Sequence, residues 1–88
     1  MVKHYRITVF GQITHMGYRF RTLHAARLLS ITGTVAETPE GLIIEAEGEE
    51  TRLKQLVSFF KELPSPDPPM VIKIDEMPLR YFNEFTIT

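Results

Sequence analysis

Apolar and polar residues alternate near the start of the chain. Within residues 4–10, single polar positions separate the apolar side chains of Tyr5, Ile7 and Val9. A period of two residues is typical of a strand with one face in the core and the other in solvent. The pattern predicts a first strand over residues 4–10.

The next regular run has the spacing of a helix. From residue 20 to residue 31, apolar side chains recur at steps of three and four, and Gly33 follows as a stop signal. The pattern predicts a first helix over 20–31. Its apolar face is expected to contain Phe20, Leu23, Ala26 or Arg27, and Leu29 or Ser30, widened by Ala25 and Leu28.

A turn signal separates the two short strands that come next. In the segment Thr38-Pro39-Glu40-Gly41, proline presets one backbone angle and glycine accepts a positive φ. We therefore expect strands over 34–37 and 42–47, paired as antiparallel neighbours.

The second half of the chain predicts one more helix and two more strands. From Glu49 onward, apolar residues fall at helical steps, and the acidic residues at the start suit the helix dipole. The four prolines of segment 64–69 lack backbone donors, so this segment should be an extended surface connection. Alternation over 72–75 and 84–87 predicts the last two strands. The apolar positions of this second helix are Leu53, Leu56, Val57, Phe60 and Leu63.

The order β-α-β-β-α-β with an added strand predicts a ferredoxin-like α+β sandwich. In this arrangement two helices cover one face of a mostly antiparallel sheet. The 88 residues suffice for one domain, 1–88. Because a helix joins the first two strands, they should run parallel. Loop 11–18 and hairpin 37–41 should then be neighbours.

Composition narrows the classes of partner. Hydrophobic residues at 43% and charged residues at 24% are ordinary for a globular protein. The formal charge of −1 leaves no basic stripe for nucleic acid, and the predicted third strand lacks aromatic residues on which bases could stack. No run approaches the roughly 20 apolar residues of a membrane span, so a soluble cytoplasmic protein is expected. We also expect a monomer. The three histidines show no metal-ligand spacing, and no metal site is expected.

The loop from Gly11 to Arg19 is the first candidate for chemistry. A loop that leads into a helix presents unpaired N–H groups, and the helix dipole also favours an anion there. Glycines at 11 and 17 allow the backbone to wrap closely, and the Arg19 guanidinium suits the paired oxygens of a phosphate. The alternative is a plain glycine-rich connection with a solvated arginine.

The same residues resemble the acylphosphatase family. The loop matches the family signature in Phe10-Gly11-x-Ile13-x-x-Met16-Gly17-Tyr18-Arg19, and further matches reach residues 85–87. The resemblance implies hydrolysis of a small acyl phosphate, release of inorganic phosphate, and no metal or cofactor. It also implies that the arginine and the loop amides hold the phosphoryl group. The implied phosphate-binding residues are Gln12, Ile13, Thr14, His15, Met16, Gly17, Tyr18 and Arg19.

Two departures from the family pattern bear on activity. Glu37 stands where the family has its catalytic asparagine, and an ionised carboxylate repels an anionic substrate. Glu37 either pairs with Arg19 or acts as a general base on water. Thr14 and His15 replace the usual Gln-Gly. A protonated His15 would add positive charge to the phosphate-binding loop 11–19, and the alternative is that its side chain is solvated.

Three functional hypotheses therefore remain open. The first is an acylphosphatase-like hydrolase that uses Arg19, with Glu37 in a doubtful catalytic role. The second is a catalytically silent phosphate-binding or regulatory module of the same fold. The third is a protein-interaction domain that uses an edge of its sheet.

Overall fold

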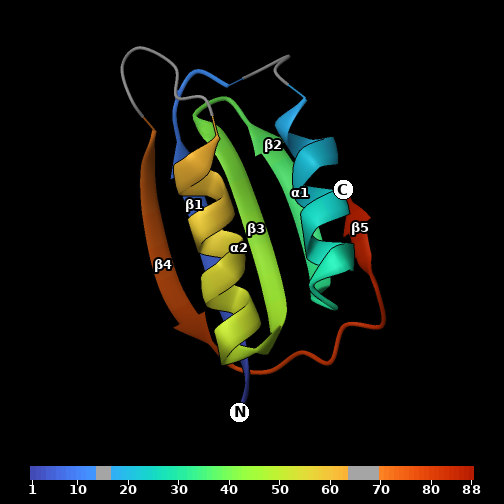
Figure 1. The fold of residues 1–88 in the computed structure, drawn as a ribbon. Helices are drawn as coiled ribbons and strands as arrows, with labels where there is room; N and C mark the ends of the chain where they lie inside the picture. Colours follow the sequence, from blue (N-terminus) through green and yellow to red (C-terminus); the bar gives the residue numbers. More distant parts are fainter. Residues whose placement is uncertain (14–16, 64–69) are drawn as a thin grey trace.

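The computed structural model describes residues 1–13, 17–63 and 70–88. These described residues form five strands and two helices, drawn in Figure 1. Within the described residues, no helix is both long and apolar enough to cross a bilayer. The elements are β1 (Val2–Phe10), α1 (Tyr18–Leu28), β2 (Thr32–Thr38), β3 (Gly41–Glu49), α2 (Glu50–Glu62), β4 (Val71–Met77) and β5 (Phe85–Ile87).

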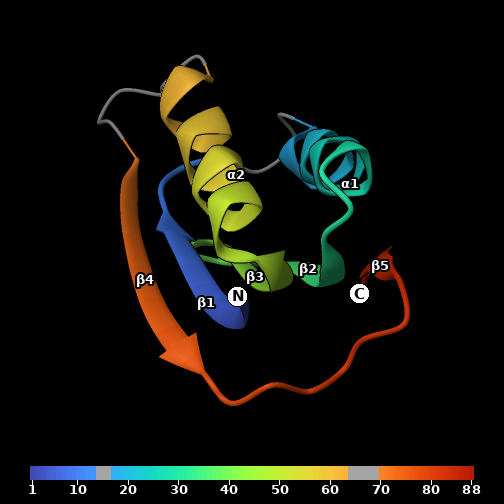
Figure 2. The same ribbon diagram turned by 60° about the horizontal axis from the view of Figure 1, so that its bottom comes forward.

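The strands form one sheet in the order β4-β1-β3-β2-β5. β3 pairs antiparallel with both β1 and β2, so β1 and β2 run in the same direction on either side of it. β4 is antiparallel to β1, while the short β5 is parallel to β2. Figure 2 shows both helices on one side of this sheet. The predicted ferredoxin-like fold is confirmed, with a mixed sheet.

The core lies between the sheet and the two helices. On β3, the side chains of Leu42, Ile44 and Ala46 alternate into it and are almost fully buried. From α2, Leu53, Leu56 and Phe60 meet them and are also fully buried. From β1, Ile7 and Val9 are also almost fully buried. The predicted apolar faces of the first strand and of the second helix are therefore confirmed. The predicted extended connection over 64–69 lies outside the described residues.

The first helix differs from its prediction in two ways. It ends at Leu28, three residues early, because Ser30 adopts a left-handed conformation with φ 56° well before Gly33. Its buried face is also different: Phe20 and Leu28, expected in the core, are 63% and 72% exposed. The buried residues of α1 are Tyr18, Thr22 and Ala26.

Thr22 explains why the spacing of apolar residues was misleading. Its side chain is fully buried, and its hydroxyl donates to the carbonyl oxygen of Tyr18 at 2.7 Å. A hydroxyl that is satisfied within its own helix loses much of its penalty for burial. A polar residue thus occupies the centre of the buried face, and the helix is rotated relative to the apolar pattern.

The connection between β4 and β5, residues 78–84, crosses the sheet face that the helices leave open. Figure 2 shows it passing on the side opposite α1 and α2. The Glu47 carboxylate on β3 accepts the backbone N–H groups of Arg80 at 2.7 Å and Phe82 at 3.1 Å. Two charge-assisted hydrogen bonds thus tie this connection to the central strand.

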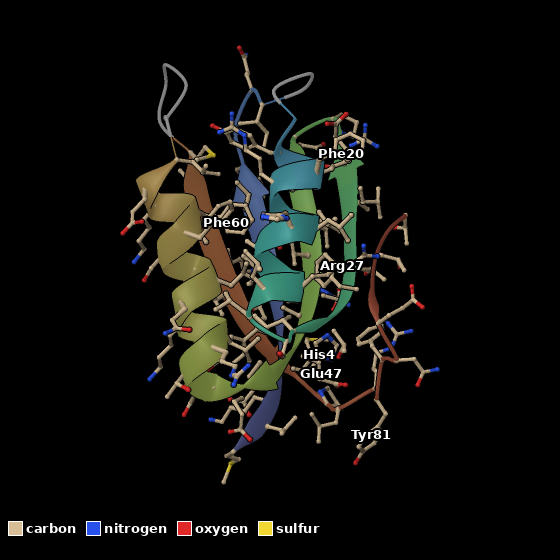
Figure 3. All side chains as sticks on the ribbon, turned by 45° about the vertical axis from the view of Figure 1, so that its right-hand side comes forward. His4, Phe20, Arg27, Glu47, Phe60 and Tyr81 are labelled. Atoms are coloured by element: carbon tan, nitrogen blue, oxygen red, sulfur yellow. The ribbon has the colours of Figure 1, made fainter. Side chains whose placement is uncertain are left out.

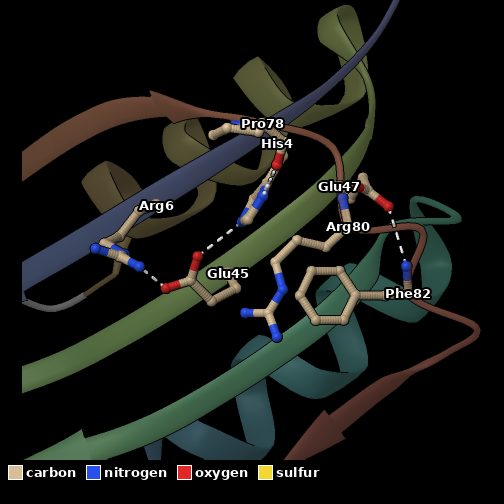
Figure 4. A network of polar contacts seen from close by, with 7 residues as sticks. All are labelled: His4, Arg6, Glu45, Glu47, Pro78, Arg80 and Phe82. Atoms are coloured by element: carbon tan, nitrogen blue, oxygen red, sulfur yellow. Dashed lines mark hydrogen bonds and ion pairs between the residues drawn. The ribbon is translucent and has the colours of Figure 1, made fainter.

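A second polar group fixes the start of the same connection, as Figure 4 shows. The buried ring of His4 lies with Nδ1 2.8 Å from the carbonyl oxygen of Pro78 and Nε2 2.7 Å from Glu45 Oε1. The other carboxylate oxygen of Glu45 accepts from Arg6 Nε at 2.7 Å. Both neighbours of the His4 ring are oxygen acceptors, so an N–H of the ring has a partner on either side.

We expect Glu47→Gln to loosen this connection without unfolding the protein. The amide keeps one acceptor oxygen but turns an NH₂ group toward one of the two backbone donors, so one hydrogen bond to a charged group is lost. Such a bond contributes about 1.5–3 kcal/mol. Hydrogen exchange should accelerate at the amides of Arg80 and Phe82 and stay unchanged in α2. Equal acceleration in α2 would contradict a local role for Glu47.

Candidate functional site

The candidate site lies at the sheet edge where β1 and β2 both end. Phe10, the last residue of β1, is paired with Gly41 at the start of β3. The next residue, Gly11, donates its backbone N–H to the carbonyl oxygen of Glu40 at 2.8 Å. The predicted contact between the loop after β1 and the β2–β3 hairpin is therefore confirmed.

Gly41 makes this close approach possible. Its φ is 151°, and a Cβ atom at this position would lie 1.9 Å from the carbonyl oxygen of Val9. Any side chain here would clash with the backbone of β1. The hairpin can therefore pack directly against the start of the loop.

The N-terminus of α1 meets the same edge. Gly17 is the N-cap residue in a left-handed conformation, φ 74° and ψ 17°, and makes no side-chain capping hydrogen bond. A glycine adopts this conformation at little cost. The first turn of α1 carries no acidic side chain, so no carboxylate there offsets the helix dipole. The first N–H groups of a helix have no partner within it, which makes this end attractive to an anion.

Arg19 and Glu37 bring opposite charges together at this edge. Arg19 belongs to the first turn of α1, and Glu37 lies one residue before the end of β2. Arg19 Nε is 3.8 Å from Glu37 Oε1, and the side chains are 38% and 29% exposed. The ion pair is thus long and open to solvent, where such pairs contribute little to stability. The pairing that the sequence suggested as one of two roles for Glu37 is present.

The other residues predicted to bind phosphate have different positions. The side chains of Ile13 and Tyr18 are buried at 1% and 3% exposure, so they belong to the hydrophobic core and anchor the loop at both ends. Only their backbone groups remain as possible ligands. Gln12 is exposed. Thr14, His15 and Met16 lie outside the described residues.

The environment of the Arg19 side chain could not be predicted from the spacing of apolar residues. The guanidinium carbon lies 5.8 Å from the ring centroid of Phe20, a cation–π contact with an exposed aromatic residue. Arg19 and Phe20 are neighbours in the sequence, but helical spacing predicts that Phe20 lies in the core. Among residues 1–13, 17–63 and 70–88, no three His, Asp or Glu side chains cluster in a way that would hold a metal ion.

Comparisons with known proteins agree with this architecture. The family model described as Acylphosphatase matches residues 5–87. The chain is 33% identical, over 99% of each sequence, to an acylphosphatase of Ligilactobacillus salivarius. Among solved structures, it resembles the acylphosphatase from Bacillus subtilis with a TM-score of 0.79 and 27% identity, covering 100% of this chain and 99% of that one. It also resembles full-length HypF, with a TM-score of 0.88 and 27% identity, but it spans only 12% of that chain.

Proposed function

Because the chain belongs to the acylphosphatase family of acyl phosphate hydrolases, we propose that it cleaves a small acyl phosphate at the edge formed by β1, β2 and α1. Arg19 and the backbone amides of residues 12–18 hold the phosphoryl group. The observation that carries this proposal is the position of Arg19, which belongs to the first turn of α1 and has a partly exposed side chain that reaches Glu37 at the end of β2. Two positive features then converge on one anion.

The reaction needs little covalent help from the protein. A water oxygen forms a bond to phosphorus, the bond from phosphorus to the carboxylate oxygen breaks, and the carboxylate leaves with the electron pair. The water proton is released to solvent. The carboxylate is a good leaving group, so holding water in line and stabilising charge on the phosphoryl oxygens supplies most of the catalysis.

Glu37 occupies the position of the family's catalytic asparagine, four residues before the hairpin glycine. In the free protein its carboxylate pairs with Arg19. An incoming phosphoryl group competes for the same guanidinium and is repelled by the Glu37 charge. We propose that Glu37 closes the empty site and weakens substrate binding, while water is oriented by the amides and the bound phosphoryl group. The protein acts as a monomeric cytoplasmic domain without a cofactor.

The Arg19–Glu37 pair also motivates a second candidate function. If the carboxylate cannot position water as an asparagine does, Arg19 and the loop amides bind phosphate without hydrolysing an acyl phosphate. The protein is then a silent anion-binding module. Both functions need Arg19, and they differ only in turnover.

Two measurements on the natural chain test these functions together. We expect hydrolysis of acetyl phosphate above the spontaneous rate, and we expect inorganic phosphate to shift the amide NMR signals of Gly17, Arg19 and Phe20. Shifts without turnover would overturn the hydrolase in favour of the silent module. If neither turnover nor shifts were observed, this edge of the sheet would be the site of neither function.

A further inference from the structure

An apolar groove runs along the outer surface of α1, beside α2. Its volume is about 430 Å³, within the usual range of small-molecule sites. The two large apolar side chains that helical spacing had placed in the core, Phe20 and Leu28, line its wall and are 63% and 72% exposed. The lining residues are Phe20, Arg21, His24, Ala25, Leu28 and Phe59.

The groove begins at the candidate site. Phe20 follows Arg19 in the chain, and its ring lies 5.8 Å from the Arg19 guanidinium. Figure 3 shows Phe20 at the end of α1 that is close to the ends of β2 and β3, where the candidate site lies. From Phe20 to Leu28 the helix advances by about 12 Å. An apolar surface therefore extends for about two turns from the proposed phosphate site.

The far wall of the groove is fixed by α2. Phe59 projects from that helix, and its ring makes an edge-to-face contact with the fully buried Phe60 at 5.4 Å. Such a contact holds an aromatic ring in a defined orientation. Phe59 is partly buried and packs against the core, so this wall is part of the folded domain.

The charges of the side chains in and beside the groove indicate which kind of ligand it would bind. Among the described residues that line the groove, no side chain is acidic, and Arg21 adds a positive charge. Arg19 stands at the end nearest the proposed phosphate site. A ligand with an anionic head and an unbranched apolar tail matches this order, with its head at Arg19 and its tail along Phe20 and Leu28.

We propose that this groove binds the acyl chain of the substrate, so that the enzyme prefers medium-chain acyl phosphates over short ones. The proposal rests on the proposed hydrolase function and extends it to the substrate class. Phe20, Leu28 and Phe59 are specificity residues that touch the methylene chain. They do not contact the reacting phosphoryl group, which is bound by Arg19 and the loop amides.

Decanoyl phosphate and acetyl phosphate provide the test. Both have alkyl carboxylate leaving groups of similar acidity, so their intrinsic reactivity is matched. Each buried methylene contributes a factor of about four to binding, so burying three raises kcat/KM about 60-fold. The gain should appear as a lower KM with kcat unchanged, because the chain is bound equally before and during the reaction. Decanoyl phosphate is kept below its micelle concentration.

A pair of variants assigns the preference to the groove. Leu28→Ser should reduce the decanoyl-to-acetyl ratio of kcat/KM about fivefold, because part of the apolar wall is lost. Val2→Ser is the matched control. Val2 is also an exposed apolar residue, at 48%, but it lies at the start of β1, away from the groove. The control should leave the ratio at its natural value.

A binding measurement separates this proposal from the proposed function. Sodium decanoate, the product carboxylate, should shift the amide signals of residues 20–28 and of Phe59, and sodium acetate should not. Turnover of acetyl phosphate with a ratio near one and no decanoate shifts would overturn the groove alone. An absence of turnover with either substrate would overturn the hydrolase, and the acyl groove would fall with it.

Discussion

Replacement of Arg19 by alanine is expected to lower kcat/KM for acetyl phosphate by about 10²–10³-fold, the usual effect of losing one donor that stabilises transition-state charge. Arg19 belongs to the first turn of α1, and its partly exposed guanidinium is the positive charge that we propose for the phosphoryl group. Its planar fork can hold two phosphoryl oxygens, and the loop amides alone cannot replace that charge. Steady-state kinetics with the natural chain and the variant provide the measurement.

Two further variants make the result specific. Arg19→Lys keeps the charge but loses the paired donors, so we expect an activity between those of the natural chain and the alanine variant. Lys54→Ala removes one positive charge from the exposed side of α2 and should have no effect on acetyl phosphate. If Arg19→Ala were as active as the natural chain, hydrolysis would not occur at this site.

The second large effect is expected at Glu37, in the opposite direction. Glu37→Asn should raise kcat/KM for acetyl phosphate by about 10- to 100-fold, mainly through a lower KM. The carboxylate repels each unit of substrate charge by about 3 kcal/mol at a separation near 5 Å and an effective dielectric constant near 20. Asparagine removes that repulsion, releases Arg19 from the ion pair, and offers both a donor and an acceptor to water.

Glu37→Gln and Glu40→Gln separate local from general electrostatic effects. Glu37→Gln removes the same charge with a longer side chain, so KM should fall without the full gain in kcat. Glu40 is an exposed residue of the neighbouring hairpin, so Glu40→Gln should change little. If kcat instead dropped sharply with both Asn and Gln at position 37, Glu37 would be a general base and the proposed inhibitory role would be wrong.

Much of the fold could be predicted from periodicity because the buried face of β1 and that of α2 each consist of regularly spaced apolar residues. Ile7 and Val9 are alternate residues of β1 that point into the core of the domain. Leu53, Leu56 and Phe60 are buried in the same core and are spaced as one face of a helix in α2. The turn signal before Gly41 predicted the β2–β3 hairpin correctly. The proximity of loop 11–18 and hairpin 37–41 also followed from topology, since parallel strands joined by a helix end at one edge of the sheet. The ion pair between Arg19 and Glu37 was one of two roles that the sequence left open for Glu37.

Periodicity predicted neither which face of the first helix is buried nor that the sheet face opposite the helices is covered. Thr22 is buried because its hydroxyl finds a partner within the helix, so the most apolar stripe is not the buried one. His4 and Glu45 occupy strand positions that alternation assigns to solvent, yet they are covered. The cover is the 78–84 connection, and no local pattern indicates where that segment crosses the sheet.

Local patterns along the chain therefore determined the elements and their order, because each element depends on backbone preferences and short-range spacing. The topology that follows from this order places the loop after β1 beside the β2–β3 hairpin. The rotation of α1, the exposed groove from Phe20 to Leu28, and the burial of the His4–Glu45 pair were decided only by tertiary packing. The physical reason is that a polar group can be buried once a distant or backbone partner satisfies it, and an apolar group stays exposed when no neighbour covers it.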